Sequence, residues 1–216
     1  MNLSLEYLIK EPKIKKDTNP LLLLLHGYGS NEADLFSFAS ELPEDYYIVS
    51  ARAPYDLQYG SYAWYAINFD ADENKFSDHE QAKVSRDLIG TFIDELVANY
   101  PIDKNSITLI GFSQGAILSY GVALSNPKKI KNVIGLSGYV SEPILKQGFE
   151  NNDFSTLGIF ASHGTVDQVI PIEWARKSDN FLTQTNIAHT YKEYPIGHGI
   201  SPQVFFDFKN WLQAHS

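Results

Sequence analysis

Short apolar runs alternate along this chain with segments in which apolar residues recur every three or four positions. The runs are rich in Leu, Ile and Val, which is typical of strands buried on both faces. We expect strands at residues 3–9, 21–25, 46–50, 107–110, 133–136, 157–161 and 190–194. The periodic segments predict helices at residues 31–42, 77–100, 114–125, 171–185 and 202–213. The alternation predicts an α/β fold, a mostly parallel central sheet with helices on both faces.

One segment departs from this alternation. Residues 53–77 are rich in aromatic side chains but show no clear period, and we expect a long loop there. Loops of this length are uncommon in compact domains unless they serve function or are disordered. Ser77 and Glu80 match a capping box at the start of the helix that follows. The expected buried face of that helix is an apolar stripe: Val84, Leu88, Phe92, Leu96 and Tyr100.

Composition and charge narrow the class of protein. The chain has 216 residues, of which 44% are hydrophobic and 20% charged, as in an ordinary globular domain. No linker or internal repeat divides it, so we expect a single domain over residues 1–216. The net charge of −9 argues against nucleic acid and anionic membranes as partners, because both attract clustered Lys and Arg.

The absence of cysteine excludes disulfides, thiolate metal sites and a cysteine nucleophile. The first residues do not match a signal peptide. The apolar run at residues 21–25 is far shorter than the roughly 20 residues that a membrane span requires. We therefore expect a cytoplasmic protein without a membrane span.

A candidate nucleophile lies between an expected strand and an expected helix. Residues 111–115, Gly-Phe-Ser-Gln-Gly, fit the pattern G-x-S-x-G with Ser113 at its centre. In such a motif the serine occupies a strained strand-to-helix turn, which side chains at the two glycine positions would crowd. The helix N-terminus also directs N–H groups toward developing negative charge. A chance match in an ordinary loop is the alternative, and the flanking strand and helix argue against it.

A serine hydroxyl is a weak nucleophile at neutral pH, so it needs a base, and the base needs an orienting acid. The histidines that follow the serine are His163, His189, His198 and His215. We favour His198 because it stands between two glycines, after an expected strand and before a helix. For the acid we favour Asp167, which follows the strand at residues 157–161 and precedes a helix. A helix cap is the alternative role for Asp167.

The first buried strand ends in a glycine-rich turn, His-Gly-Tyr-Gly at residues 26–29. Glycines allow the backbone to fold close to a reacting carbonyl. We expect the backbone N–H groups of Tyr28 and Gln114 to form an oxyanion hole, in which each donor contributes about 100- to 1,000-fold in rate. His26 precedes the nucleophile, and we expect it to make structural hydrogen bonds rather than act as a base.

Residues 26–29 with Asp34, residues 111–116, the His163-Gly164 pair with Asp167, and Gly197-His198 together resemble the phospholipase/carboxylesterase family of α/β-hydrolases. That family includes small bacterial carboxylesterases and the acyl-protein thioesterases. The resemblance spans about residues 20–212. It implies an α/β-hydrolase fold with a minimal lid, and hydrolysis of carboxylic esters or thioesters without a metal or cofactor.

The resemblance also assigns individual roles. It places the nucleophile on Ser113, the acid on Asp167 and the base on His198, and the oxyanion donors on Tyr28 and Gln114. A family tryptophan corresponds to Trp64. Two positions depart from the family pattern: Tyr28 stands where an aliphatic residue is frequent, and Gln168 follows the acid where proline is frequent.

We expect Trp64, Tyr62 and Val169 to contact the substrate. The loop at residues 53–77 would form a fixed wall over the mouth of the site, and its aromatic side chains are Tyr55, Tyr59, Tyr62, Trp64, Tyr65 and Phe69. An aromatic cluster that only packs against the sheet is the alternative.

The sequence therefore predicts a serine hydrolase, a carboxylesterase that cleaves esters of short to medium acyl chains through an acyl-enzyme on Ser113. A thioesterase or lysophospholipase acting on long acyl chains is the alternative within the same chemistry. An inactive hydrolase-fold binding module is the alternative from another class, and the intact Ser, Asp and His argue against it. The expected partner is a small-molecule ester or thioester, and a homodimer is left open.

Overall fold

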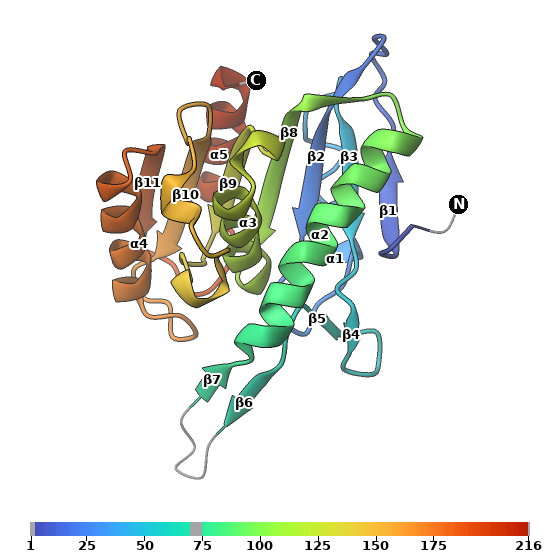
Figure 1. The fold of residues 1–216 in the computed structure, drawn as a ribbon. Coiled ribbons are helices and arrows are strands. Elements are labelled where there is room, and N and C mark those ends of the chain that lie inside the picture. The colour runs from blue at the N-terminus through green and yellow to red at the C-terminus, as the bar shows by residue number, and fades with distance from the viewer. Residues whose placement is uncertain (1–2, 70–74, 216) are drawn as a thin grey trace.

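Strands from the whole length of the chain form one central sheet (Figure 1). The computed structural model describes residues 3–69 and 75–215, without the side chains of Phe69, Lys75 and Phe76. The strand order is β1-β3-β2-β8-β9-β10-β11, and every neighbouring pair is parallel except β1 with β3. The strands are β1 (Tyr7–Lys10), β2 (Asn19–Leu25), β3 (Tyr47–Ala51), β8 (Ile102–Phe112), β9 (Asn132–Leu136), β10 (Gly158–Gly164) and β11 (Ala188–Tyr194). The predicted mostly parallel sheet is confirmed.

Helices cover both faces of this sheet (Figure 1). One face carries α2 (His79–Asn99), α3 (Gln114–Ser125) and α4 (Ile172–Gln184). The other carries α1 (Ala33–Phe36) and α5 (Pro202–Ala214). Short 3₁₀ turns lie at Pro127–Lys129, Glu142–Ile144 and Phe149–Asn151. Within the described ranges, every helix is too short or too polar to cross a membrane.

The leucine run of β2 shows how the sheet divides the core. Leu21, Leu23 and Leu25 pack in the cluster under α2 and α3. Leu22 and Leu24 pack in the cluster under α1 and α5. Successive side chains of a strand point to opposite faces, so a central strand covered on both sides is apolar at every position.

The helix predicted at residues 31–42 is much shorter in the structure. Only Ala33–Phe36 is α-helical, and residues 37–42 form turns and a bend. The N–H groups of Phe38 and Ala39 bond to carbonyls three residues back, as in a 3₁₀ turn. The Ser37 hydroxyl donates to the Asp34 carbonyl at 2.6 Å, a local bond that competes with helix propagation.

The start and the buried face of α2 also differ from the prediction. The cap is Asp78, whose carboxylate accepts the Gln81 N–H at 3.0 Å, and not the expected Ser77–Glu80 box. Val84, predicted on the buried face, is exposed. Phe92 and Leu96 are buried as predicted. The face toward the sheet also carries residues outside the predicted stripe: Ala82, Ser85, Arg86, Ile89, Gly90 and Ile93.

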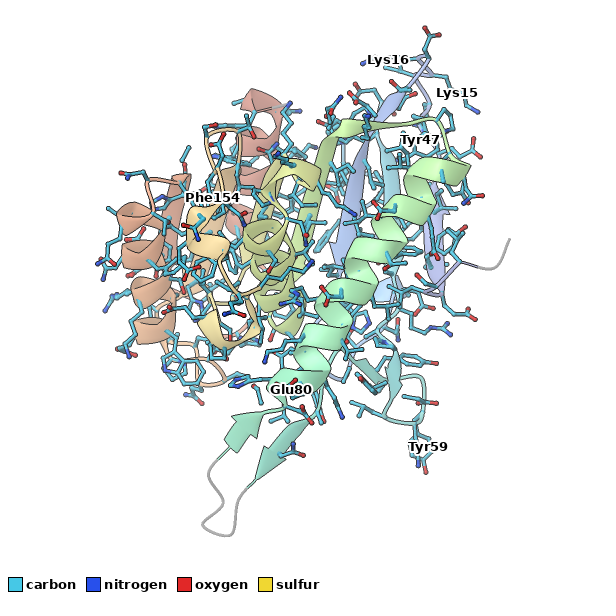
Figure 2. The ribbon with its side chains drawn as sticks, viewed as in Figure 1. Lys15, Lys16, Tyr47, Tyr59, Glu80 and Phe154 are labelled. Atoms are coloured by element: carbon cyan, nitrogen blue, oxygen red, sulfur yellow. The ribbon has the colours of Figure 1, made fainter. Side chains whose placement is uncertain are left out.

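The predicted loop at residues 53–77 contains two short hairpins. Strand β4 (Tyr55–Asp56) pairs with β5 (Tyr62–Ala63), and β6 (Ile67–Phe69) pairs with β7 (Lys75–Ser77). Both project at the end of the sheet where α2 begins (Figure 1). Tyr59, in the turn between β4 and β5, is fully exposed and points away from the body of the protein (Figure 2). Residues 70–74 of the predicted loop lie outside the described residues, as does the Phe69 side chain.

Candidate active site

Strand β8 ends in a strained turn that presents Ser113. The backbone of Ser113 has φ 53° and ψ −116°, and α3 begins at the next residue, Gln114. A non-glycine residue with positive φ is uncommon and persists only where surrounding contacts hold it. The Ser113 N–H donates to the Leu136 carbonyl at 2.9 Å, which ties the turn to the end of β9.

The two glycines of the motif are required by close backbone contacts. A Cβ atom at Gly111 would lie 2.4 Å from the Gly115 carbonyl oxygen. A Cβ atom at Gly115 would lie 2.0 Å from the carbonyl oxygen of Leu25, at the end of β2. The expected crowding at both positions is therefore confirmed, and α3 packs directly on the backbone of the neighbouring strand.

The structure brings Ser113, His198 and Asp167 into one chain of hydrogen bonds. His198 Nε2 lies 2.9 Å from the Ser113 hydroxyl oxygen, and His198 Nδ1 lies 2.7 Å from Asp167 Oδ2. An ionised carboxylate only accepts hydrogen bonds, so Nδ1 carries the proton. Nε2 is then free to accept the serine proton. The ring of Phe112 supports the imidazole at a centroid distance of 4.9 Å.

Neighbouring parallel strands place the acid and the base. Asp167 follows β10 and His198 follows β11, and these strands pair in parallel. The carboxyl ends of parallel strands meet at one edge of the sheet. Gly164 permits the close approach of the two loops, because a Cβ atom there would lie 2.3 Å from the Ile196 carbonyl oxygen. The Thr165 N–H donates across to the Tyr194 carbonyl at 2.7 Å.

Asp167 is held as a carboxylate by its hydrogen bonds. Burial alone would raise its pKa, but hydrogen bonds from the Ile170 N–H, the His198 ring and the Val169 N–H outweigh burial, and the pKa is lowered. The two backbone donors contact Oδ1 at 2.8 and 3.0 Å, which leaves Oδ2 to His198. The acid therefore accepts from its own loop as well as from the base.

His163 lies behind the acid rather than beside the serine. Its ring is fully buried, and its Nε2 lies 2.9 Å from the Ile170 carbonyl and 3.4 Å from Asp167 Oδ2. A carbonyl oxygen accepts only, so Nε2 carries a proton. Nδ1 has no hydrogen-bond partner among the described residues. His163 therefore supports the loop that holds Asp167, a contact that the sequence analysis missed.

The proposed oxyanion donors face the same space as Ser113. Gln114 is the first residue of α3, so its N–H has no acceptor within the helix. Among the described residues, the Tyr28 N–H donates no hydrogen bond. A Cβ atom at Gly27 would lie 3.4 Å from the Ser113 Cβ, so the turn after β2 packs on the nucleophile. Both N–H groups are therefore available to a substrate oxygen.

His26 and Trp64 form a buried support beneath this turn. His26 Nε2 accepts the Ala53 N–H at 3.1 Å, and Nδ1 lies 2.7 Å from the Gly27 carbonyl. Burial lowers the pKa of His26, so its ring is neutral at pH 7. Trp64 is 0% exposed and donates its indole N–H to the His26 carbonyl at 2.9 Å. The structural role expected for His26 is confirmed.

A cavity of about 640 Å³ opens beside Ser113 and His198. Of the residues expected to contact the substrate, Val169 lines this cavity, whereas Trp64 and Tyr62 do not. Tyr62 instead packs under the Arg52 guanidinium, 4.8 Å from its ring centroid. Tyr65, from the aromatic segment expected to wall the site, does line the cavity. Other side chains on the cavity wall were not named in advance: Ile67, Ile117, Tyr139 and Trp174. Within the described ranges, no group of His, Asp and Glu side chains could hold a metal ion.

The Gln114 side chain fixes the segment that carries Tyr65. Its Oε1 accepts the Trp64 N–H at 2.7 Å, and its Nε2 donates to the Tyr65 carbonyl at 2.8 Å. The Ser85 hydroxyl on α2 donates to the Trp64 carbonyl. The residue after the nucleophile thus holds one wall of the cavity in place.

A nucleophile elbow on a mostly parallel sheet, with an acid and a histidine after later strands, defines an α/β-hydrolase. Residues 8–216 match the model of the Phospholipase/Carboxylesterase family. The chain belongs to this family, and it is a carboxylic ester hydrolase.

Sequence relatives support this assignment. The chain is 27% identical to "Acyl-protein thioesterase 1" of Yarrowia lipolytica, over 90% of this chain and 91% of that protein. It is 28% identical to "Acyl-protein thioesterase 1" of Cryptococcus neoformans, over 98% of both. Among solved structures, the Bacillus cereus carboxylesterase superposes with a TM-score of 0.84 at 22% identity, covering 98% of this chain and 95% of that one. That likeness shows the fold.

Proposed function

We propose that the chain is a serine carboxylesterase in which Ser113, His198 and Asp167 act as a catalytic triad. The observation that carries this proposal is the continuous hydrogen-bonded chain from the serine hydroxyl through His198 to Asp167, at the mouth of a largely apolar cavity. We also propose that residues 1–216 act as a single hydrolase domain.

The reaction takes place in two steps. In the first, Ser113 Oγ attacks the ester carbonyl carbon while His198 Nε2 accepts the hydroxyl proton. Asp167 stabilises the imidazolium, and the N–H groups of Tyr28 and Gln114 bind the oxyanion. His198 then gives its proton to the departing alcohol. In the second step His198 takes a proton from a water molecule, which attacks the acyl-enzyme carbonyl. His198 then returns that proton to Ser113 Oγ as the bond to the acyl group breaks and the acid leaves.

The acyl group occupies the cavity beside Ser113. Ile67, Ile117 and Val169 supply aliphatic walls, and Tyr65 and Trp174 supply aromatic ones. Such walls favour an apolar acyl group over a charged one, because a charge would lose its hydration without gaining a partner. The substrate class proposed is esters of short to medium acyl chains.

Thioester hydrolysis is the second candidate. Two relatives that match 90% or more of this chain carry the name acyl-protein thioesterase 1. The same acyl-enzyme forms from an ester or a thioester, because both place a carbonyl carbon before the nucleophile. Oxygen and sulfur esters of one acyl group, compared by kcat/KM, distinguish the two candidates.

A fluorophosphonate probe tests the triad directly. Wild-type protein should be labelled at a single serine, and Ser113→Ala should abolish the labelling. The matched control is Ser119→Ala, a buried serine on α3 whose hydroxyl bonds to the Gly115 carbonyl. That variant should be labelled like the wild type. Absence of labelling in folded wild-type protein, or labelling that survives Ser113→Ala, would exclude the proposed mechanism.

A further inference from the structure

A second cavity adjoins the one beside Ser113. It measures about 350 Å³, and its walls are mixed: Val140, Pro143 and Phe181 are apolar, whereas Ser141, Glu142, Lys177 and Ser178 are polar. Three residues line both cavities: His79, Tyr139 and Trp174. The two spaces therefore lie on opposite sides of a shared wall.

The rings of Tyr139 and Trp174 form the centre of this wall. They meet edge to face, with centroids 4.8 Å apart and planes at 78°, an arrangement that aromatic pairs prefer. Tyr139 lies three residues beyond the end of β9, and Trp174 lies in the first turn of α4. Two segments far apart in the chain therefore supply the pair.

We propose that Tyr139 and Trp174 are specificity-determining residues that limit the length of the acyl chain by closing the first cavity from the second. The inference rests on the proposed function, because it takes the acyl-enzyme on Ser113 as its starting point. The acyl group remains attached to Ser113 through both steps, whereas the alcohol leaves after the first. The cavity beside the serine therefore contacts the acyl group in both steps, whereas the alcohol is present only in the first.

The shared wall sets the acyl-chain length beyond which an added methylene no longer raises kcat/KM. Each CH₂ that a chain buries in the first cavity raises kcat/KM by about fourfold. A chain that reaches the two rings gains nothing from further methylenes, because no space remains on the near side. Removing one ring should join the two cavities and give a longer chain access to the apolar side chains of Val140, Pro143 and Phe181 in the mixed wall of the second cavity.

Trp174→Ala is the most direct test. Trp174 is 44% exposed, so its removal creates no sealed cavity in the core. The measurement is kcat/KM for p-nitrophenyl esters from acetate to palmitate, in the wild type and in the variant. We expect the optimum to move to longer chains, and the ratio of long-chain to short-chain kcat/KM to rise by about fourfold for each added CH₂ that enters the second cavity.

Two control variants separate the wall from general effects of losing an aromatic side chain. Tyr139→Phe removes the hydroxyl but keeps the ring, so it should keep the chain-length preference of the wild type. Phe206→Ala removes an aromatic side chain that is 59% exposed on α5, away from both cavities, and should do the same. Circular dichroism establishes that each variant is folded. If Trp174→Ala does not fold, Trp174→Leu replaces it in the same series.

Each result of this series supports or overturns the inference. An optimum that moves to longer acyl chains supports it. An unchanged profile in Trp174→Ala, or an equal loss at every chain length, overturns it. A series with the acyl group fixed and the alcohol lengthened gives the remaining outcome: a shift in alcohol preference alone would place the leaving group in the cavity and overturn the inference. Failure of the proposed function looks different, because the wild type itself would then resist fluorophosphonate labelling.

Discussion

Replacing Gly115 with alanine tests how tightly the nucleophile turn is packed. The added Cβ atom would lie 2.0 Å from the Leu25 carbonyl oxygen, 2.5 Å from the Leu25 carbonyl carbon and 2.7 Å from the His26 carbonyl oxygen. All three are backbone atoms, so no side-chain rotation relieves the contacts. An ordinary separation begins at 3.4 Å, so α3 would have to move away from β2 by about 1.4 Å.

That displacement affects both stability and catalysis. Extra atoms in a packed core cost about 1–3 kcal/mol of unfolding free energy, and a clash with backbone on two residues lies at the upper end. We expect Gly115→Ala to lower the free energy of unfolding by about 3 kcal/mol. The neighbouring Gln114 N–H would move with the helix. A misplacement of about 1 Å costs about 100-fold in rate, so kcat/KM should fall by at least that factor.

Gly90→Ala is the matched control, because it makes the same change inside helix α2. A Cβ atom at Gly90 would meet nothing within 4 Å. Alanine is favoured over glycine in a helix by about 1 kcal/mol, so this variant should be more stable than the wild type. Urea denaturation with linear extrapolation measures both variants. A Gly115→Ala protein within about 1 kcal/mol of the wild type and with wild-type kcat/KM would refute the packing argument.

Further predictions concern the triad. Ser113→Ala and His198→Ala should each lower ester hydrolysis by about 10⁶-fold, and the double variant should be little worse, because the residues act as a unit; additive losses of kcat would contradict this. Asp167→Asn should lower kcat by about 10⁴-fold, since an amide cannot hold the imidazole in the required tautomer; activity near that of the wild type would remove Asp167 from the mechanism. The lowered pKa of Asp167 stabilises the fold above the ordinary aspartate pKa of about 4, and this contribution is lost as the pH falls through the folded-state pKa. The unfolding free energies of wild type and Asp167→Asn, measured in urea from pH 7 to pH 3, should therefore converge toward low pH; a constant difference would mean that Asp167 has an ordinary pKa.

The positions of Ser113, Asp167 and His198 could be predicted because each has a local signal. Ser113 lies between two glycines of a recognisable motif, His198 lies between Gly197 and Gly199, and Asp167 follows a strand and precedes a helix. The parallel sheet supplies the rest, because residues that follow parallel strands reach the same edge. Local pattern and fold together were sufficient to bring three distant residues into one prediction.

The cavity could not be predicted in the same way. Trp64 lies in an aromatic segment, but the direction of its ring depends on a space beneath His26 that only the folded sheet creates. Tyr139 follows β9 and therefore had the same positional signal as Asp167, yet it belongs to no recognisable motif. Trp174 had no signal, because its place on the cavity wall depends on how α4 packs. Catalytic residues lie in short sequence motifs, whereas the residues that shape a pocket are brought together only by the tertiary fold.

The spacing of the triad along the chain has a consequence for biosynthesis. The serine and the histidine are separated by 85 positions, and the acid and the histidine by 31. Parallel strands need long crossover connections, and non-local pairings form late in folding. The ribosome adds Ser113 to the chain 85 residues before His198, so the growing chain carries an unactivated hydroxyl while those residues are synthesised. Hydrolysis therefore begins only after β11 has joined the sheet. The order of the triad along the chain means that an incompletely synthesised protein does not hydrolyse esters.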